Sequence, residues 1–372
     1  MKPQINTIDI IQLASGDSLS IQVYKFIGAK PGKKAYIQGN LHGCEIIGNK
    51  VIYELIKFFS QLEQEQIAGE IWLVPVCNPL ATNERTHFFS TGRFNPYDGQ
   101  DWNRIFWDYE KECGDLGNFV AAQVTSETDL IRKNFLKEIL TAFQKQLDKI
   151  QAPSSVPYSE CYRYYLQSLC LDANYVIDIH SSSNQAIDYL YCFHSREESA
   201  KYFLLEQGIL MNKYDGEAFD EAFMKPWLAI EKQLKQVGQP ITFDVESWTL
   251  ELGSGSVMEP NSVARGVKGI INYLTYKKVL PLKEVKETAI KLFPKSQIKK
   301  YYASVGGMVK NRVKLGTQVK AGELLYQVLC FPFSHKLPKE IDVYAENSGL
   351  VFDLSLNQAV NQGEYVLAIM EN

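Results

Sequence analysis

The segment Ile71-Trp72-Leu73-Val74-Pro75-Val76 has no charged or amide side chain at any position, so it suits a place where both of its sides are covered. A strand of this kind is typical of a parallel sheet with helices on each face. Residues 175–179 form a second apolar strand. We expect further strands at 35–39, 188–193, 241–246 and 249–252, and a hairpin of alternating strands at 5–13 and 19–27.

Helical periodicity fills most of the sequence between these strands. Apolar residues recur at helical spacing in 46–63, 119–150, 158–171, 196–212, 217–236 and 260–275. Strands that alternate with helices indicate an α/β fold with a mixed, largely parallel sheet flanked by helices. We expect this part of the fold to span residues 1–290, with the stretch 108–172 as a helical insertion.

The pattern changes after Pro294. Residues 297–372 have short alternating segments separated by turn signals and no helical periodicity, which predicts a small all-β domain. Its hairpins resemble a biotinyl/lipoyl-like barrel. A carrier domain of that kind needs a lysine at the hairpin tip, and the tip predicted here, 347–349, has none. We therefore interpret this domain as a structural or substrate-gating module.

Composition excludes several classes of protein. A net charge of −4 without a basic stripe argues against nucleic-acid binding. The apolar runs are far shorter than the 18 or so residues of a membrane span, and the first residues lack the apolar core of a signal peptide. Seven irregularly spaced cysteines favour reduced thiols in a cytoplasmic protein. The oligomeric state is open, and a homo-oligomer is compatible with this composition.

Two segments carry residues suited to metal binding. His42 and Glu45 lie three apart in a glycine-containing turn after the strand at 35–39, and His180 follows the apolar strand at 175–179. Ligand sites in open α/β sheets lie at the carboxyl ends of the strands, so these three side chains can converge on one zinc ion. The alternatives are a polar helix start for the first pair and a capping role beside the following serines for His180.

A zinc hydrolase also needs a general base, and Glu251 is our candidate. It lies at the end of a predicted strand, directly before a glycine-serine turn. Glu246, five residues earlier, is the competing candidate. Asp178 shares a strand face with His180 and is predicted either to hydrogen-bond it from behind or to form a salt bridge elsewhere.

The long polar segment from Asn78 to Arg104 offers positive groups. Asn103 and Arg104 are predicted to grip a substrate carboxylate, because a guanidinium can donate two parallel hydrogen bonds to it. Arg93 is a further positive donor, available either to the tetrahedral intermediate of the reaction or to that carboxylate. The alternative for each arginine is a solvated side chain of the loop. His87 is predicted to be a solvated or substrate-rim residue of this segment, and His194 and His335 are predicted to be structural.

Four ordered motifs together carry a resemblance that covers roughly residues 35–275. They are His42-x-x-Glu45, Asn78-Pro79 with Asp101-Trp102-Asn103-Arg104, Asp178-Ile179-His180-Ser181, and Glu251-Leu252-Gly253. They resemble the motifs of the succinylglutamate desuccinylase/aspartoacylase family, a branch of the zinc carboxypeptidase-like superfamily.

The resemblance implies one zinc ion per chain and a role for each residue of the motifs. His42, Glu45 and His180 would be its ligands and Glu251 the general base. Asn103 and Arg104 would bind the substrate carboxylate. The family's oxyanion-stabilising arginine fits Arg93 best, with Arg85 as the alternative. The family's substrate-contacting tyrosine has no clear match among its three candidates, Tyr189, Tyr191 and Tyr214.

We therefore expect a hydrolase that cleaves the amide of an N-acyl amino acid or a similar small molecule bearing a carboxylate. A zinc carboxypeptidase acting on peptide C-termini is the alternative enzyme, because the same clamp serves both reactions. A non-catalytic binding protein of the same fold is the alternative from another class. The insertion at 108–172 and the C-terminal domain favour a restricted pocket, and hence a small substrate.

Overall fold

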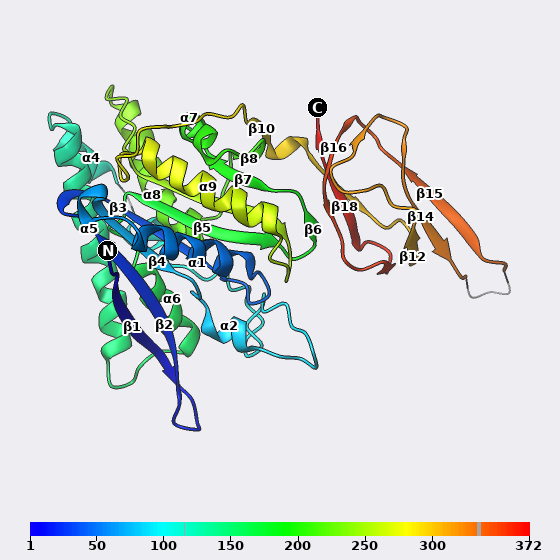
Figure 1. Ribbon diagram of the computed structural model, residues 1–372, viewed down its shortest axis with the longest axis horizontal. Coiled ribbons are helices and arrows are strands. Elements are labelled where there is room, and N and C mark those ends of the chain that lie inside the picture. Colours follow the sequence, from blue (N-terminus) through cyan, green and yellow to red (C-terminus); the bar gives the residue numbers. More distant parts are fainter. Residues whose placement is uncertain (115, 333–335) are drawn as a thin grey trace.

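The structure of the protein is a computed structural model, of which residues 1–114, 116–332 and 336–372 are described. Figure 1 shows an α/β body with a smaller body of strands beside it. The predicted fold class is confirmed. A nine-stranded sheet runs through the α/β body. Its strands, in spatial order, are β1 (Gln4–Gln12), β2 (Ser18–Ile27), β4 (Ala68–Val74), β3 (Lys30–Gly39), β5 (Tyr175–Ser182), β9 (Glu246–Ser254), β7 (Tyr189–Phe193), β8 (Gln207–Met211) and β10 (Lys291–Pro294).

The four central strands β4, β3, β5 and β9 run parallel to one another. At one side, β2 is antiparallel to β4 and forms the predicted hairpin with β1. At the other, β7 is antiparallel to β9, and β8 and β10 run parallel to β7. The carboxyl ends of β3, β5 and β9 therefore meet the amino end of β7 at one edge of the sheet.

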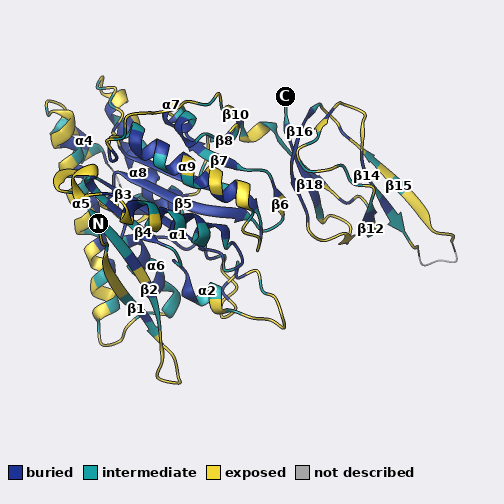
Figure 2. Ribbon diagram, in the orientation of Figure 1, coloured by how far each residue is buried: buried dark blue, intermediate teal, exposed yellow. Residues whose placement is uncertain are grey.

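Helices cover both faces of this sheet, which keeps its centre buried (Figure 2). α1 (Ile47–Ser60) and α9 (Pro260–Tyr276) pack together on one face, and α5 (Thr128–Gln151), α6 (Tyr158–Ser168) and α8 (Phe219–Gln236) lie on the other. The predicted insertion at 108–172 forms α3 (Tyr109–Cys113), α4 (Gly117–Gln123), α5 and α6. The other helical segments of the described residues are α2 (Pro79–Asn83), α7 (Glu197–Ala200) and the 3₁₀ turns η1 (Gln64–Gln66), η2 (Lys201–Phe203) and η3 (Lys295–Gln297).

The predicted helix at 196–212 is wrong. Only α7 and η2 are helical there, and Leu204 takes the left-handed backbone conformation (φ 58°) that ends the turn. The residues that follow become β8, paired with β7 and β10. The predicted strand at 241–246 is also wrong, since β9 begins at Glu246.

The two faces of the central strands differ at the edge where their carboxyl ends meet. Alternate residues of a strand point to opposite faces. On the face covered by α1 and α9, Ile37, Ile177 and Leu250 belong to an apolar core. On the other face, Gln38, Asp178 and Thr249 form one polar row across β3, β5 and β9, and His180 and Glu251 form the next.

The C-terminal strands form two small antiparallel sheets around a core of their own. One contains β11 (Ile298–Tyr302), β18 (Tyr365–Glu371), β16 (Gly349–Leu354) and β13 (Gln318–Val319), joined by β6 (Gln185–Ala186) from the α/β body. The other contains β15 (Lys339–Tyr344), β14 (Leu324–Cys330), β12 (Gly307–Lys310) and β17 (Ala359–Val360). We call β11 to β18 the C-terminal β-domain. The predicted division of the chain between 290 and 297 stays a prediction.

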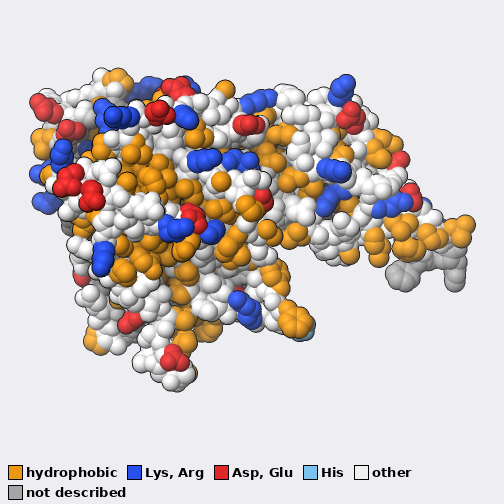
Figure 3. Space-filling model, in the orientation of Figure 1, with side chains coloured by type: hydrophobic (Ala, Val, Ile, Leu, Met, Phe, Trp, Pro, Cys, Tyr) orange, Lys and Arg blue, Asp and Glu red, His pale blue; other side chains and the backbone are white. Residues whose placement is uncertain are grey.

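The distribution of charged side chains on the surface agrees with the small net charge of −4. On the face drawn in Figure 3, acidic and basic side chains are interspersed among apolar and uncharged ones. All seven cysteines are unpaired. Among the described residues, no helix has both the length and the apolar character that crossing a membrane requires.

Candidate active site

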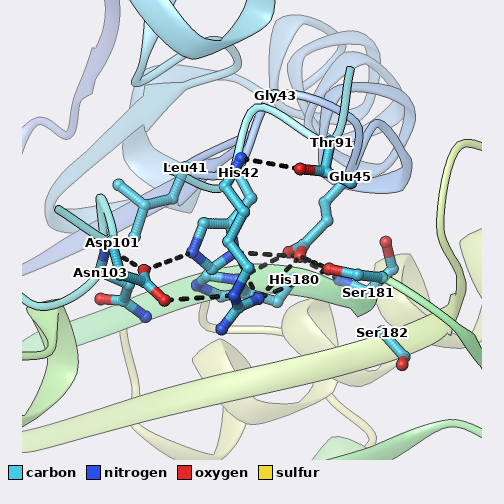
Figure 4. Close-up of polar contacts among 12 residues, drawn as sticks. Leu41, His42, Gly43, Glu45, Thr91, Asp101, Asn103, His180, Ser181 and Ser182 are labelled. Carbon is cyan, nitrogen blue, oxygen red and sulfur yellow. Dashed lines mark hydrogen bonds and ion pairs between the residues drawn. The ribbon is translucent and has the colours of Figure 1, made fainter. Parts of the chain in front are cut away.

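His42, Glu45 and His180 lie together at the carboxyl ends of β3 and β5 (Figure 4). Nδ1 of His42 is 2.9 Å from Oε1 of Glu45, and Nδ1 of His180 is 2.9 Å from Oε2 of the same carboxylate. One ligand atom from each residue lies within 4.8 Å of the other two. All three side chains are at least 96 % buried.

The turn that carries His42 and Glu45 depends on a close approach between β3 and α1. A Cβ on Gly39 would lie 2.9 Å from the Cα of Gly48, so only glycine lets the helix begin so near the strand. Asn40 takes a left-handed conformation (φ 69°) and donates from Nδ2 to the carbonyls of His42 and Gly43. The backbone thus turns sharply and brings both ligands to the same point.

Each histidine has a carboxylate behind it. Nε2 of His42 is 3.2 Å from Oδ1 of Asp101, and Nε2 of His180 is 2.9 Å from Oδ2 of Asp178. A carboxylate behind a ligating imidazole fixes its orientation and leaves the other nitrogen free to bind a metal. The structure therefore places Asp178 behind His180, as one of the two sequence interpretations had it.

The charges at this cluster fit a divalent cation. Burial alone would lower the pKa of each histidine, but Glu45 with Asp101 raises that of His42, and Asp178 with Glu45 raises that of His180 well above its ordinary value. Burial would raise the pKa of Glu45, yet the two histidines hold it low. The surplus of carboxylates and the two-nitrogen, one-oxygen donor set are those of catalytic zinc sites.

Arg93 lies beside the cluster and is about one-third exposed. Its Nε is 3.2 Å from Oδ2 of Asp101, and its Nη1 is 3.8 Å from Oε1 of Glu45. His42 and Arg93 outweigh the effect of burial and lower the pKa of Asp101 to about 2. Arg85, the alternative for the oxyanion role, is exposed and donates to backbone carbonyls of its own loop.

Glu251 is next to His180 in the sheet, because these residues are register partners in β9 and β5. Burial raises the pKa of the Glu251 carboxyl group to about 7, against the opposing effect of His180. Its buried Oε2 has no hydrogen-bond partner among the described residues. Glu246 lies at the opposite end of β9, bonded to Ser199, Tyr273 and Lys277, so it is remote from the cluster.

Asn103 and Arg104 follow Asp101 in the loop that borders the site. The backbone N–H of Asn103 donates to Oδ1 of Asp101, and its side-chain oxygen accepts from the N–H of Phe219 at the start of α8. Arg104 is exposed, and its Nη1 donates to the carbonyl of Asn103. Asn103 is therefore held in place by α8, whereas the guanidinium of Arg104 faces solvent.

The three candidate tyrosines separate into two groups. Tyr189 is the register partner of Glu251, and Tyr191 is that of Thr249, so both lie along the polar rows. Tyr214 packs against Phe193. Of the remaining histidines, His87 and His194 are exposed, and His335 lies outside the described residues.

Two residues of the site were given no role from the sequence. Asp101 bonds both His42 and Arg93, and its signal was its place two residues before Asn103. Ser183 donates from Oγ to Oε1 of Glu45. Its signal was the run of serines after His180. The roles assigned to individual residues stay predictions, although the structure brings the predicted ligands, Glu251 and Arg93 together.

A profile of the Succinylglutamate desuccinylase/Aspartoacylase catalytic domain matches residues 31–277. The chain is 25% identical over 343 residues to N-alpha-acetyl-L-2,4-diaminobutyric acid deacetylase of Halomonas elongata, with 91% of this chain and 82% of that protein covered.

Two solved structures of Shewanella proteins assigned to the same family have closely similar folds. The protein from Shewanella amazonensis superposes with a TM-score of 0.87 at 27% identity, covering 99% of this chain and 98% of the other. The one from Shewanella frigidimarina gives 0.88 at 24% identity, covering 100% and 98%. The likeness therefore extends over both the α/β body and the C-terminal β-domain.

Proposed function

Because this chain belongs to the succinylglutamate desuccinylase/aspartoacylase family, we propose that it is a zinc-dependent deacylase of N-acyl amino acids. The observation that carries the proposal is the buried group of His42, Glu45 and His180, with Glu251 next to it in the sheet. A zinc ion held there would lower the pKa of a bound water to about 7 and polarise the substrate carbonyl.

Glu251 takes the role of general base in this proposal. Burial keeps the pKa of its carboxyl group near 7, so it can accept a proton from the attacking water and pass it to the leaving nitrogen at neutral pH. Its Oε2 is buried and has no hydrogen-bond partner among the described residues, which leaves it available for that transfer.

Arg93 takes the role of electrostatic partner of the oxyanion. It is held by Asp101 and is close enough to the ligand Glu45 to face the reacting carbonyl. Arg104, on the solvent side of Asn103, binds the substrate carboxylate as the substrate enters. Asn103, fixed by its bond to Phe219, provides the second contact to that carboxylate.

The charges narrow the substrate class. Arg93 is already paired with Asp101, and Glu45, Asp178 and Glu251 are further carboxyl groups of the site. A bound zinc ion would offset the charge of Glu45, but a second carboxylate of the substrate placed beside Asp101 or Glu251 would still meet a group of its own charge. We therefore propose N-acyl amino acids with one carboxylate as substrates. The Halomonas elongata relative, named for an N-acetylated diamino acid, supports this choice.

The test is a hydrolysis screen combined with metal analysis of the purified protein. We expect about one zinc per chain, turnover of N-acetyl-2,4-diaminobutyrate and other N-acetyl amino acids, and weaker turnover of N-acetylaspartate and N-succinylglutamate. Removal of zinc by a chelator should abolish activity, and added zinc should restore it. Release of C-terminal residues from peptides, without hydrolysis of any N-acyl amino acid, would indicate a carboxypeptidase. A protein with neither zinc nor turnover would indicate a binding protein.

A further inference from the structure

The C-terminal β-domain is joined to the segment that follows His180. β6 adds to the edge of β16, with Ala186 and Gln185 opposite Asp353 and Leu354. The N–H of Ile187 donates to the carbonyl of Phe352 at 3.0 Å. An apolar cluster with residues from both parts of the chain surrounds this pairing. The contact is thus part of the folded core and includes main-chain hydrogen bonds.

Asp353 lies at the centre of this contact with 8 % of its surface exposed. Its Oδ2 accepts a hydrogen bond from Oγ of Ser182 at 2.5 Å, and its Oδ1 accepts from Nδ2 of Asn184 at 3.3 Å. The hydroxyl of Tyr365, on the neighbouring strand β18, also donates to Oδ1. A carboxylate can accept from all three donors at once, whereas an amide in its place would present an N–H₂ to some of them.

Ser183, which lies between Ser182 and Asn184, contacts the proposed zinc site. Oγ of Ser183 donates to Oε1 of Glu45 at 3.2 Å, and Nη1 of Arg93 lies 3.5 Å from the same Oγ. The N–H of Ser181 donates to Oε2 of Glu45 at 3.4 Å. Figure 4 shows this segment running past the carboxylate of Glu45. Both oxygens of the ligand are therefore contacted by one short stretch.

We propose that Asp353 is a positioning residue of the active site, although it lies in the C-terminal β-domain. By fixing Ser182 and Asn184 it holds Ser183 against Glu45 and Arg93, which orients the ligand carboxylate and the guanidinium. The inference rests on the proposed function. Removal of a group that hydrogen-bonds a metal ligand directly changes metal affinity or activity by about 10–100-fold, and Asp353 acts from further away, through Ser183, so we expect the lower end of that range.

The test compares Asp353→Asn with Asp342→Asn. Asp342 is an exposed carboxylate of the same domain that also accepts two side-chain hydrogen bonds, from Gln327 and Tyr344, but on β15 of the other sheet. For each folded variant we would measure the zinc dissociation constant by chelator competition, kcat and KM. We expect Asp353→Asn to weaken zinc binding and lower kcat by about 10-fold each, and Asp342→Asn to match the wild type.

Ser182→Ala provides a second variant that removes one donor and leaves the carboxylate in place. If Asp353 acts through Ser182, the double variant Ser182→Ala/Asp353→Asn should bind zinc as tightly, and have the same kcat, as Asp353→Asn alone. A merely structural role would lower the melting temperature and leave zinc affinity and kcat of the folded protein unchanged, and that result overturns the inference.

The failure of each proposal has a separate signature. A wild-type protein without zinc and turnover overturns the proposed function together with this inference. A wild type that binds zinc and hydrolyses substrate, beside an Asp353→Asn variant with equal zinc affinity and kcat, overturns this inference alone.

Discussion

The two faces of the central sheet use the same strands for opposite purposes. Ile177 and Asp178 are neighbours in β5, yet the first lies in the apolar core under α1 and α9 and the second hydrogen-bonds His180. One face stays apolar up to the edge of the sheet, while the other becomes polar over its last two rows. The difference shows that strand alternation alone separates residues that stabilise the fold from residues that build the site.

The largest effect should come from His180→Ala on the polar face. Loss of this imidazole removes a proposed ligand, so bound zinc and turnover should both fall to background. This effect is larger than the loss of about 10–100-fold expected when a group that hydrogen-bonds a ligand is removed. Elemental analysis and a deacylation assay measure the two. A variant that keeps stoichiometric zinc and wild-type activity would contradict the ligand assignment.

Glu251→Gln should separate binding from chemistry on the same face. Zinc should stay bound, while kcat should fall by about 10²-fold or more because general acid–base catalysis is lost. Glu246→Gln is the matched control, since that carboxylate lies at the other end of β9. Normal kinetics for Glu251→Gln would show that another group is the base.

The acid limb of kcat/KM should report the same carboxyl group. Burial raises the pKa of Glu251 to about 7, and the base must be deprotonated, so activity should rise with pH through that region and fall about tenfold per unit below it. A zinc ion nearby can only lower this pKa, so the midpoint should lie at or below about 7. A profile without an acid limb between pH 4 and about 7 would contradict the assignment.

Asp178→Asn and Ile177→Val compare the two faces directly. The first should weaken zinc binding by about 10–100-fold, because Asp178 orients His180. The second should reduce the free energy of unfolding by about 0.5–1.5 kcal/mol and leave zinc affinity unchanged. Zinc titration and denaturant unfolding of both variants measure these quantities. Similar zinc affinities in the two variants would contradict the claim that only the polar face supports the proposed zinc site.

The fold class and the clustering of the proposed ligands were predictable because both follow from local patterns. Apolar strands separated by helices specify the parallel sheet, and the carboxyl ends of its strands bring His42, Glu45 and His180 to one edge. β8 was not predictable in this way. The apolar residues that precede β8 are also compatible with one face of a helix. The helical turn ends at Leu204 in a left-handed conformation. Leucine normally avoids that conformation, so the sequence does not mark the end of the turn.

The contact between Ser182 and Asp353 was also beyond sequence reasoning. The two residues are 171 positions apart, and neither belongs to a recognisable motif. Asp101 is an intermediate case, because the motif around Asn103 marked its position and only the fold showed that it joins His42 to Arg93.

The pairing of β6 with β16 also has a consequence for biosynthesis. On the ribosome, the segment after His180 emerges long before Asp353 does. The strand edge of β6 therefore stays unpaired, and the apolar residues beside it stay exposed, until β16 and β18 have been synthesised. The nine-stranded sheet can form its core earlier, but Asp353 and Tyr365 can fix the segment beside the proposed ligands only after β16 and β18 have been synthesised. A chain that terminates before β16 would thus be left with an unpaired strand edge beside the proposed metal ligands, a site for self-association that β16 otherwise covers.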